Sequence, residues 1–125
     1  MKKVVVPAKE TGESFIIRPM ELNDLDQIMA IEHMSFSVPW TKGMFVEILA
    51  GGLGALVLEE EDKIAAYVIF YMAATEGHVM NVAVDPQVRR KHLATRLLAH
   101  TFGLLRDKGI TECYLEVREG NLGAQ

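Results

Sequence analysis

The sequence predicts an α/β fold of the α+β kind, in which three helices cover a mixed sheet of about five strands. Segments rich in β-branched and aromatic residues alternate with segments of helical periodicity in the order βααβββαβ. A length of 125 residues, half of them hydrophobic, suits one domain around one core. The chain also lacks internal repeats and heptad seams. We therefore expect a single domain over residues 1–125.

The N-terminal half of the chain predicts one strand and two helices. Residues 14–18 have the composition of a strand, and the residues before them are expected to form a loose arm. Asn23 is expected to cap a first helix that ends near His33. Thr41 is expected to cap a second helix, which a group of glycines ends.

The C-terminal half predicts a hairpin, a further strand, a long helix and a last strand. Residues 55–59 and 64–71 flank an acidic turn and are typical of an antiparallel hairpin. Residues 78–84 form the next apolar strand. An amphipathic helix follows and ends at Gly109, and residues 111–117 form the last strand.

Composition limits the environment and the partners. The net charge of −4 argues against broad nucleic-acid binding, so we expect no direct nucleic-acid partner. The longest apolar run, residues 64–74, is too short for a membrane span, and the first ten residues do not form a signal peptide. Cys113 has no second cysteine to pair with and is expected to be buried. These features favour a cytoplasmic protein without membrane attachment.

A basic segment joins the fourth strand to the long helix. VDPQVRRKHLATRLL, residues 84–98, leads from a strand through a turn to a helix N-terminus, and it carries Arg89, Arg90 and Lys91. Unpaired backbone N–H groups and the helix dipole favour anions at such an end, so the segment predicts a phosphate site. The alternative is a solvated basic helix start. Neither the P-loop nor the Rossmann glycine motif is present.

Three stretches resemble a known family. NVAVDP (81–86) followed by RRKHLA (89–94) resembles the acetyl-CoA motif Q/R-x-x-G-x-G/A of the GCN5-related N-acetyltransferases. EHMSFSVPWT (32–41) and YLEVREGNLGA (114–124) resemble the bacterial ribosomal-protein-alanine N-acetyltransferases. The resemblance implies a GCN5-related acetyltransferase fold and a single N-acetyltransferase domain over residues 1–125.

The resemblance also implies a site for acetyl-CoA. Strand main chain would hold the pantetheine arm, and amides of the basic segment would bind the pyrophosphate. His92 stands where the family has its first glycine, so its Cβ could hinder the phosphate or strain the turn, although its ring could donate to the phosphate. No metal is expected, because His92 has no further ligand at suitable spacing. The assigned residues are Val82, Ala83, Val84, Arg89, Arg90, Lys91, His92, Leu93, Ala94, Thr95 and Asn121.

For catalysis, the resemblance assigns Glu116 as the base that deprotonates the acceptor amine. The alternative is a solvated glutamate on an edge strand. Phe36, Pro39 and Trp40 would lie beside the peptide groove, although an aromatic pair between two helices is also typical of a core. The acidic residues 59–62 could attract a basic peptide or form a solvated turn.

The expected reaction is acetyl transfer to the N-terminal α-amine of a protein, in particular a ribosomal protein. An acetyl-CoA-binding module without turnover and an acetyltransferase acting on lysine or a small amine stay open as alternatives. The sequence shows no partner for the remaining histidines, which are His33, His78 and His100.

The family motif continues beyond the end of this sequence. In the family, a tyrosine that protonates the CoA thiolate follows, together with a last helix and strands, whereas this sequence ends at Gln125. The resemblance therefore implies a C-terminally incomplete domain that binds acetyl-CoA at most weakly, turns over slowly or not at all, and tends to associate through the unpaired edge of its last strand. Tyr114 is expected to serve packing, and Tyr67 and Tyr71 are expected on a distant hairpin.

Overall fold

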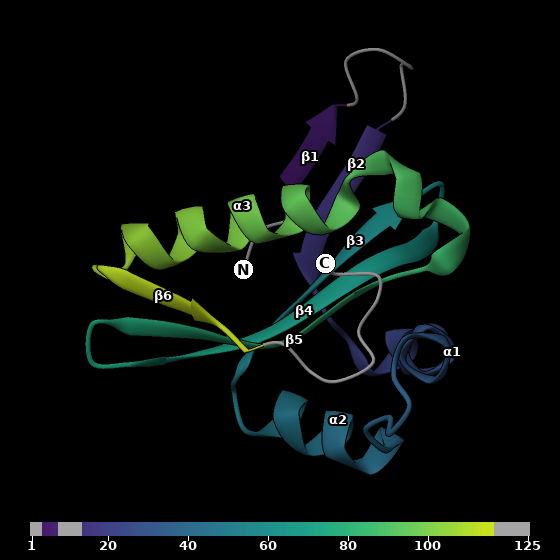
Figure 1. The fold of residues 1–125 in the computed structure, drawn as a ribbon, viewed down its shortest axis with the longest axis horizontal. Coiled ribbons are helices and arrows are strands. Elements are labelled where there is room, and N and C mark those ends of the chain that lie inside the picture. Colours follow the sequence, from purple (N-terminus) through teal and green to yellow (C-terminus); the bar gives the residue numbers. More distant parts are fainter. Residues whose placement is uncertain (1–3, 8–13, 117–125) are drawn as a thin grey trace.

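Six strands form one mixed sheet in the order β1 to β6 (Figure 1). The computed structural model describes residues 4–7 and 14–116. Neighbouring strands are antiparallel, except that β5 and β6 run parallel. The strands are β1 (Val4–Pro7), β2 (Ser14–Pro19), β3 (Gly54–Glu60), β4 (Lys63–Ala73), β5 (Glu76–Val84) and β6 (Glu112–Leu115).

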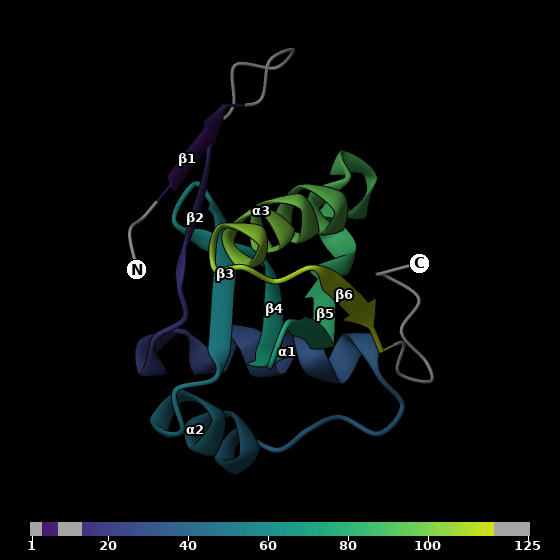
Figure 2. The ribbon, with the colours of Figure 1, turned by 90° about the vertical axis from the view of Figure 1, so that its left-hand side faces the viewer.

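Helices cover both faces of the sheet. The helix α3 lies on one face, and α1 and α2 lie on the other, as the two views agree (Figures 1 and 2). Within the described residues no helix has the length and apolar character needed to cross a membrane. The helices are α1 (Leu25–Ser35), α2 (Lys42–Ala50) and α3 (Leu93–Asp107), with short 3-10 segments η1 (Leu22–Asp24) and η2 (Pro86–Lys91).

Alternation along the strands builds two hydrophobic cores. In β3, Leu56 belongs to the core under α3, whereas Val57 belongs to the core under α1 and α2. In β4, Val68 and Tyr67 are divided in the same way. Successive side chains of a strand point to opposite faces, so the middle of each of these strands is apolar on both faces.

The predicted fold class is confirmed, and each of the predicted five strands and three helices is present. The N-terminal arm is a correction, because Val4–Pro7 forms β1 and pairs antiparallel with β2. The sequence does not predict this strand, because a four-residue strand acquires its structure from its partner and not from local propensity.

The start of the first helix is a second correction. Asn23 does not cap α1, which begins at Leu25 after the 3-10 turn η1. The carboxylate of Asp24 decides this geometry, since it accepts hydrogen bonds from the N–H of Glu21 at 2.7 Å and from Arg18. The prediction for the second helix is confirmed, because the hydroxyl of Thr41 accepts from a backbone N–H in the first turn of α2.

Cys113 is the third correction. It is exposed and not buried. The strand β6 is short, and all four of its residues are exposed, because it lies at the end of the described sheet and pairs there with β5.

Candidate functional site

The segment between β5 and α3 presents backbone amides at a helix N-terminus. The carboxylate of Asp85 accepts from the N–H of Gln87 at 3.0 Å and begins the turn η2. His92 then adopts the left-handed conformation, with φ 56° and ψ 37°, and α3 starts at Leu93. The first N–H groups of a helix have no acceptor within it, so this end favours an anion.

The predicted pyrophosphate residues meet at this turn. Arg89, Arg90 and Lys91 form the last part of η2, but their side chains lie outside the described part of the structure. Leu93, Ala94 and Thr95 form the first turn of α3. The backbone thus brings all seven residues of the predicted segment to one helix N-terminus.

The end of β5 carries the three residues that are predicted to hold the coenzyme arm through their main chain. Val82, Ala83 and Val84 are 2%, 0% and 1% exposed. Their side chains fill the two cores, and on one side they pair with β4. Any ligand of this strand must therefore meet backbone groups, which fits the predicted role of holding a pantetheine arm.

A bulge and a change of pairing lie just before these residues. The register between β4 and β5 shifts so that Ile69 pairs with Asn81 and Phe70 with Val79. Met80 is therefore the extra residue of β5. The registered pairing of β5 with β6 also stops at Val79.

Glu116 lies at this point, immediately after β6. Its backbone N–H donates to the carbonyl of Val79 at 3.0 Å. Its side chain is 57% exposed, and Oε1 lies 4.0 Å from Nδ1 of His78. The backbone fixes the residue next to β5, while the carboxylate stays accessible to a substrate.

His78 is the residue near Glu116 that the sequence did not indicate. Its ring lies between the ring of Tyr71, at a centroid distance of 4.7 Å, and that of Tyr114, at 5.2 Å. Its Nε2 lies 3.0 Å from Oε1 of Glu76. The three rings are cross-strand neighbours, since His78 is registered with Tyr71 in β4 and with Tyr114 in β6.

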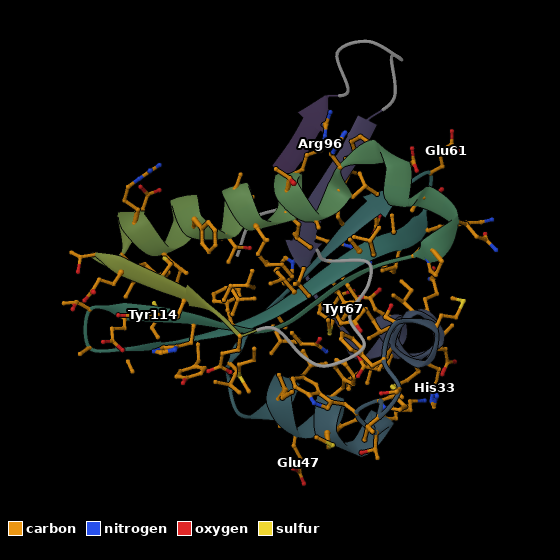
Figure 3. All side chains as sticks on the ribbon, in the orientation of Figure 1. His33, Glu47, Glu61, Tyr67, Arg96 and Tyr114 are labelled. Carbon is orange, nitrogen blue, oxygen red and sulfur yellow. The ribbon has the colours of Figure 1, made fainter. Side chains whose placement is uncertain are left out.

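This stack corrects the expectation that Tyr71 lies on a distant hairpin. Tyr71 contacts the same imidazole as Tyr114, beside Glu116. Tyr114 lies on β6, which pairs with β5 at the β4 and β5 hairpin (Figure 3). Its hydroxyl donates to Glu112, and this hydrogen bond raises the pKa of the Tyr114 phenol above its ordinary value.

The predicted acceptor segment runs between α1 and α2. Phe36 is 4% exposed and belongs to the core under these helices, as the packing alternative expected. Trp40 is half-buried and packs on Phe45 with ring centroids 5.5 Å apart. Pro39 is also half-buried. Of the three predicted residues, Pro39 and Trp40 are thus the ones that keep surface for a ligand.

The acidic hairpin turn divides into two parts. Glu59 forms an ion pair with Arg18, which also binds Asp24 through both carboxylate oxygens. These carboxylates raise the pKa of the Arg18 guanidinium further above its usual range. Glu61 and Asp62 form the exposed tip of the turn. The side chain of Glu59 therefore serves the fold.

Comparison with known proteins decides the family. The model of the acetyltransferase (GNAT) family matches residues 25–125. The chain belongs to the GNAT acetyltransferase family. The proteins of this family catalyse acetyl transfer, and relatives of this chain are named as N-acetyltransferases. The chain is accordingly an acyltransferase enzyme.

The curated relatives are named as N-acetyltransferases. The putative ribosomal protein bS18-alanine N-acetyltransferase of Bacillus subtilis strain 168 is 32% identical over 87% of this chain and 74% of its own length. The bS18-alanine N-acetyltransferase of Escherichia coli strain K12 is 31% identical over 86% of this chain and 73% of its own length. An N-alpha-acetyltransferase of Saccharolobus solfataricus is 30% identical, covering 93% and 78%.

Solved structures share the fold. The ribosomal-protein-S18-alanine N-acetyltransferase of Escherichia coli has a TM-score of 0.77 at 30% identity, covering 88% of this chain and 71% of that one. The PaiA N-acetyltransferase of Thermoplasma acidophilum, solved with coenzyme A, has a TM-score of 0.74 at 15% identity, covering 86% and 82%. At that identity the second likeness concerns the fold alone.

One predicted site residue lies beyond this description. Asn121, assigned to the coenzyme arm, falls in residues 117–125, outside the described residues.

Proposed function

We propose that this acetyltransferase transfers the acetyl group of acetyl-CoA to the N-terminal α-amine of a protein, and that the acceptor is a ribosomal protein with an N-terminal alanine. The observation that carries the proposal is the position of Glu116. Its backbone N–H donates to the carbonyl of Val79 in β5, and its carboxylate is accessible and lies next to His78. The bacterial relatives are named for a ribosomal protein and for alanine, and these names support the proposed acceptor. A ribosomal substrate places the reaction in the cytoplasm.

The chain's own residues fit acetyl-CoA along one path. The backbone of the end of β5 leads directly into η2 and the N-terminus of α3, so an extended arm and its pyrophosphate have consecutive partners. The GNAT family context and a structural neighbour with coenzyme A support this ligand. We assign it to Val82, Ala83, Val84, Arg89, Arg90, Lys91, His92, Leu93, Ala94, Thr95 and Asn121.

Glu116 is assigned to the amine. An α-amino group has a pKa near 8, so a substantial part is protonated and not nucleophilic at neutral pH. The Glu116 carboxylate takes the proton from this amine, directly or through water, so that the neutral amine can attack the acetyl carbonyl. The amide C–N bond would form as the thioester C–S bond of acetyl-CoA breaks, and CoA would leave as a thiolate that takes up a proton from solvent. His78, hydrogen-bonded to Glu76 and stacked between two tyrosines, is a second titratable group next to this carboxylate. Pro39 and Trp40 line the side from which the peptide approaches.

The experiment compares Glu116→Gln with the parent protein in a thiol-release assay on a short peptide with a free N-terminal alanine. We expect turnover to fall by about a hundredfold while acetyl-CoA affinity in calorimetry is retained, because the carboxylate serves the amine. The deficit shrinks at high pH, where the amine deprotonates without help. The matched control is Glu47→Gln, which removes an exposed carboxylate from α2 (Figure 3).

Three outcomes separate this proposal from the alternatives. Normal turnover of Glu116→Gln at neutral pH removes Glu116 from the mechanism. If calorimetry shows that acetyl-CoA binds but no amine substrate leads to thiol release, the protein is a binding module without turnover. Mass spectrometry that locates the acetyl group on a lysine side chain, with the N-terminus unmodified, indicates the lysine-directed enzyme.

A further inference from the structure

Glu32 is a buried carboxylate that the proposed function does not use. It lies one helical turn after Ile28 on the inner face of α1, and both residues are 0% exposed. An ionised carboxylate loses several kcal/mol of hydration on burial unless hydrogen bonds replace it. The hydrogen-bond partners of Glu32 therefore indicate what this carboxyl group does in the core.

Three elements meet at this carboxylate. Its Oε2 accepts the backbone N–H of Trp40 at 2.7 Å. Its Oε1 accepts from Nδ2 of Asn81 at 2.9 Å and from the hydroxyl of Tyr67. Figure 3 shows Tyr67 between the sheet and the helices α1 and α2. One side chain thus links the segment after α1 to both β4 and β5.

Two of these partners lie on opposite sides of the proposed reaction. Asn81 directly precedes the residues assigned to the coenzyme arm and directly follows the bulge at Met80. It lies two residues, about 7 Å of strand, from Val79, whose carbonyl fixes Glu116. Trp40 belongs to the acceptor segment, residues 36–41.

We propose that Glu32 is a positioning residue that couples the acceptor segment to the coenzyme strand β5. The inference rests on the proposed function, since that function gives the two sides their roles. Ordering of β5 by the coenzyme is transmitted through the amide of Asn81 to the Glu32 carboxylate and from there to the backbone of Trp40. The acceptor segment then takes the geometry that receives a peptide next to Glu116.

Stability alone cannot test this proposal. Glu32→Met keeps the volume but removes the acceptor oxygens of three hydrogen bonds, so it should lower stability whether or not the coupling exists. The coupling is therefore tested by the emission of Trp40 and by ligand binding. Tyr67→Phe is the matched control, because it deletes one hydrogen bond to the same carboxylate and leaves the links to Trp40 and Asn81 in place.

The sequence provides a direct probe, since Trp40 is its single tryptophan. The emission of the full chain is titrated with coenzyme A, while calorimetry follows binding separately. We expect coenzyme A to shift the emission of the parent protein and of Tyr67→Phe. In Glu32→Met the shift is lost although the heat of binding persists.

A second variant separates the bond between Glu32 and β5 from the bond between Glu32 and the acceptor segment. Asn81→Leu removes the bond to β5 and keeps the bond between Glu32 and Trp40. It loses the coenzyme-induced shift, but acrylamide quenching of Trp40 in the free protein stays at the parent value. Quenching increases in Glu32→Met, because the anchor of the segment is gone. This measurement also serves if Glu32→Met is too unstable for titration, since Asn81→Leu tests the coupling by itself.

Turnover gives a further readout where the parent enzyme is active. The KM for the peptide rises about tenfold in Glu32→Met, the fold-change that loss of a charge-assisted hydrogen bond corresponds to, while the affinity for coenzyme A holds. Equal emission shifts in the parent, Glu32→Met and Asn81→Leu overturn the coupling, as does a parent protein that binds coenzyme A without any shift. A parent protein with the shift but no acetyl transfer contradicts the proposed function and leaves the coupling standing.

Discussion

His92 occupies a backbone conformation that favours glycine, at the N-terminus where the pyrophosphate is assigned. Its φ of 56° lies in the left-handed region, where a side chain with a Cβ is strained. The family has a glycine at this position, and the strain shows why. The histidine therefore combines two costs, a strained turn and a Cβ beside the amides that face the ligand.

We predict that His92→Gly stabilises the protein by about 0.5 to 1 kcal/mol, because relief of the left-handed strain outweighs the added chain entropy of glycine. It should also strengthen acetyl-CoA binding, measured by calorimetry beside thermal unfolding. His92→Asn is the matched variant, since asparagine tolerates this conformation but keeps the Cβ. Tighter binding in the asparagine variant equal to that in the glycine variant would show that the Cβ does not hinder the ligand.

Asp24 gives a prediction on acid stability. Burial favours its neutral form, but hydrogen bonds from Arg18 and from the N–H of Glu21 outweigh burial and lower the pKa of Asp24 below its ordinary value of 3.8. A group with a lowered folded-state pKa stabilises the fold fully above the unfolded value. That contribution is lost as the pH falls from 3.8 through the lower folded-state pKa.

We expect Asp24→Asn to lower the free energy of unfolding by about 3 kcal/mol at neutral pH, since it leaves Arg18 short of a buried partner. It should also flatten the decline of stability below 3.8. Urea unfolding across the acid range measures both effects. The control Asp26→Asn breaks an exposed pair with Lys42 and should change stability by well under about 1 kcal/mol. Equal losses in the two variants would contradict the role of Asp24.

At the scale of elements, the β3 and β4 hairpin depends on a two-residue turn with unfavourable residues. Glu61 and Asp62 have φ values of 52° and 67°. Two-residue hairpin turns with positive φ at both positions favour Asn-Gly. The double change Glu61→Asn with Asp62→Gly should therefore raise the free energy of unfolding by about 1 kcal/mol in urea titrations. A lower unfolding midpoint would show that the side chains of Glu61 and Asp62 stabilise the turn by more than their backbone strain costs.

The sequence predicted those elements whose signals are local. Thr41 correctly predicted the start of α2, because a capping hydroxyl accepts a hydrogen bond from a backbone N–H within the next three residues. The prediction that Asn23 caps α1 was wrong, because the start of this helix depends on the ion pair between Asp24 and Arg18, and Arg18 lies in a different element, β2. The stack of Tyr71, His78 and Tyr114 could not be predicted, since it depends on register. A shift of one residue at the Met80 bulge, which lies in β5, would turn His78 to the other face of the sheet.

The candidate site was predicted unevenly for the same reason. The acetyl-CoA segment and Glu116 came from continuous motifs that resemble a family. His78 lies outside those motifs and is found only from the pairing of β5 with both neighbours. Glu32 did leave a signal, because it follows Ile28 at helical spacing on the apolar face of α1. A charged residue on that face is expected to be either solvated at its margin or held by buried partners, and only the structure shows the second.

At the scale of the whole molecule, the strand β6 lies at one end of the described sheet. Its four residues are exposed, with Tyr114 and Leu115 each 43% exposed, and its described pairing is with β5 alone. Exposed strand edges with apolar side chains tend to pair with another chain. We therefore propose that the 125-residue chain self-associates through β6.

Light scattering over a range of protein concentrations tests this association. The apparent mass of the parent protein should rise with concentration, and Leu115→Lys should keep the protein monomeric, because a charge on the edge opposes pairing. Leu53→Lys is the matched control, since it adds the same charge at a leucine that is 37% exposed, just before β3 and away from β6. If the edge is responsible, this control associates like the parent protein. A parent protein that stays monomeric at every concentration, or a control that dissociates as fully as Leu115→Lys, would show that β6 is not the contact and that general charge governs the association.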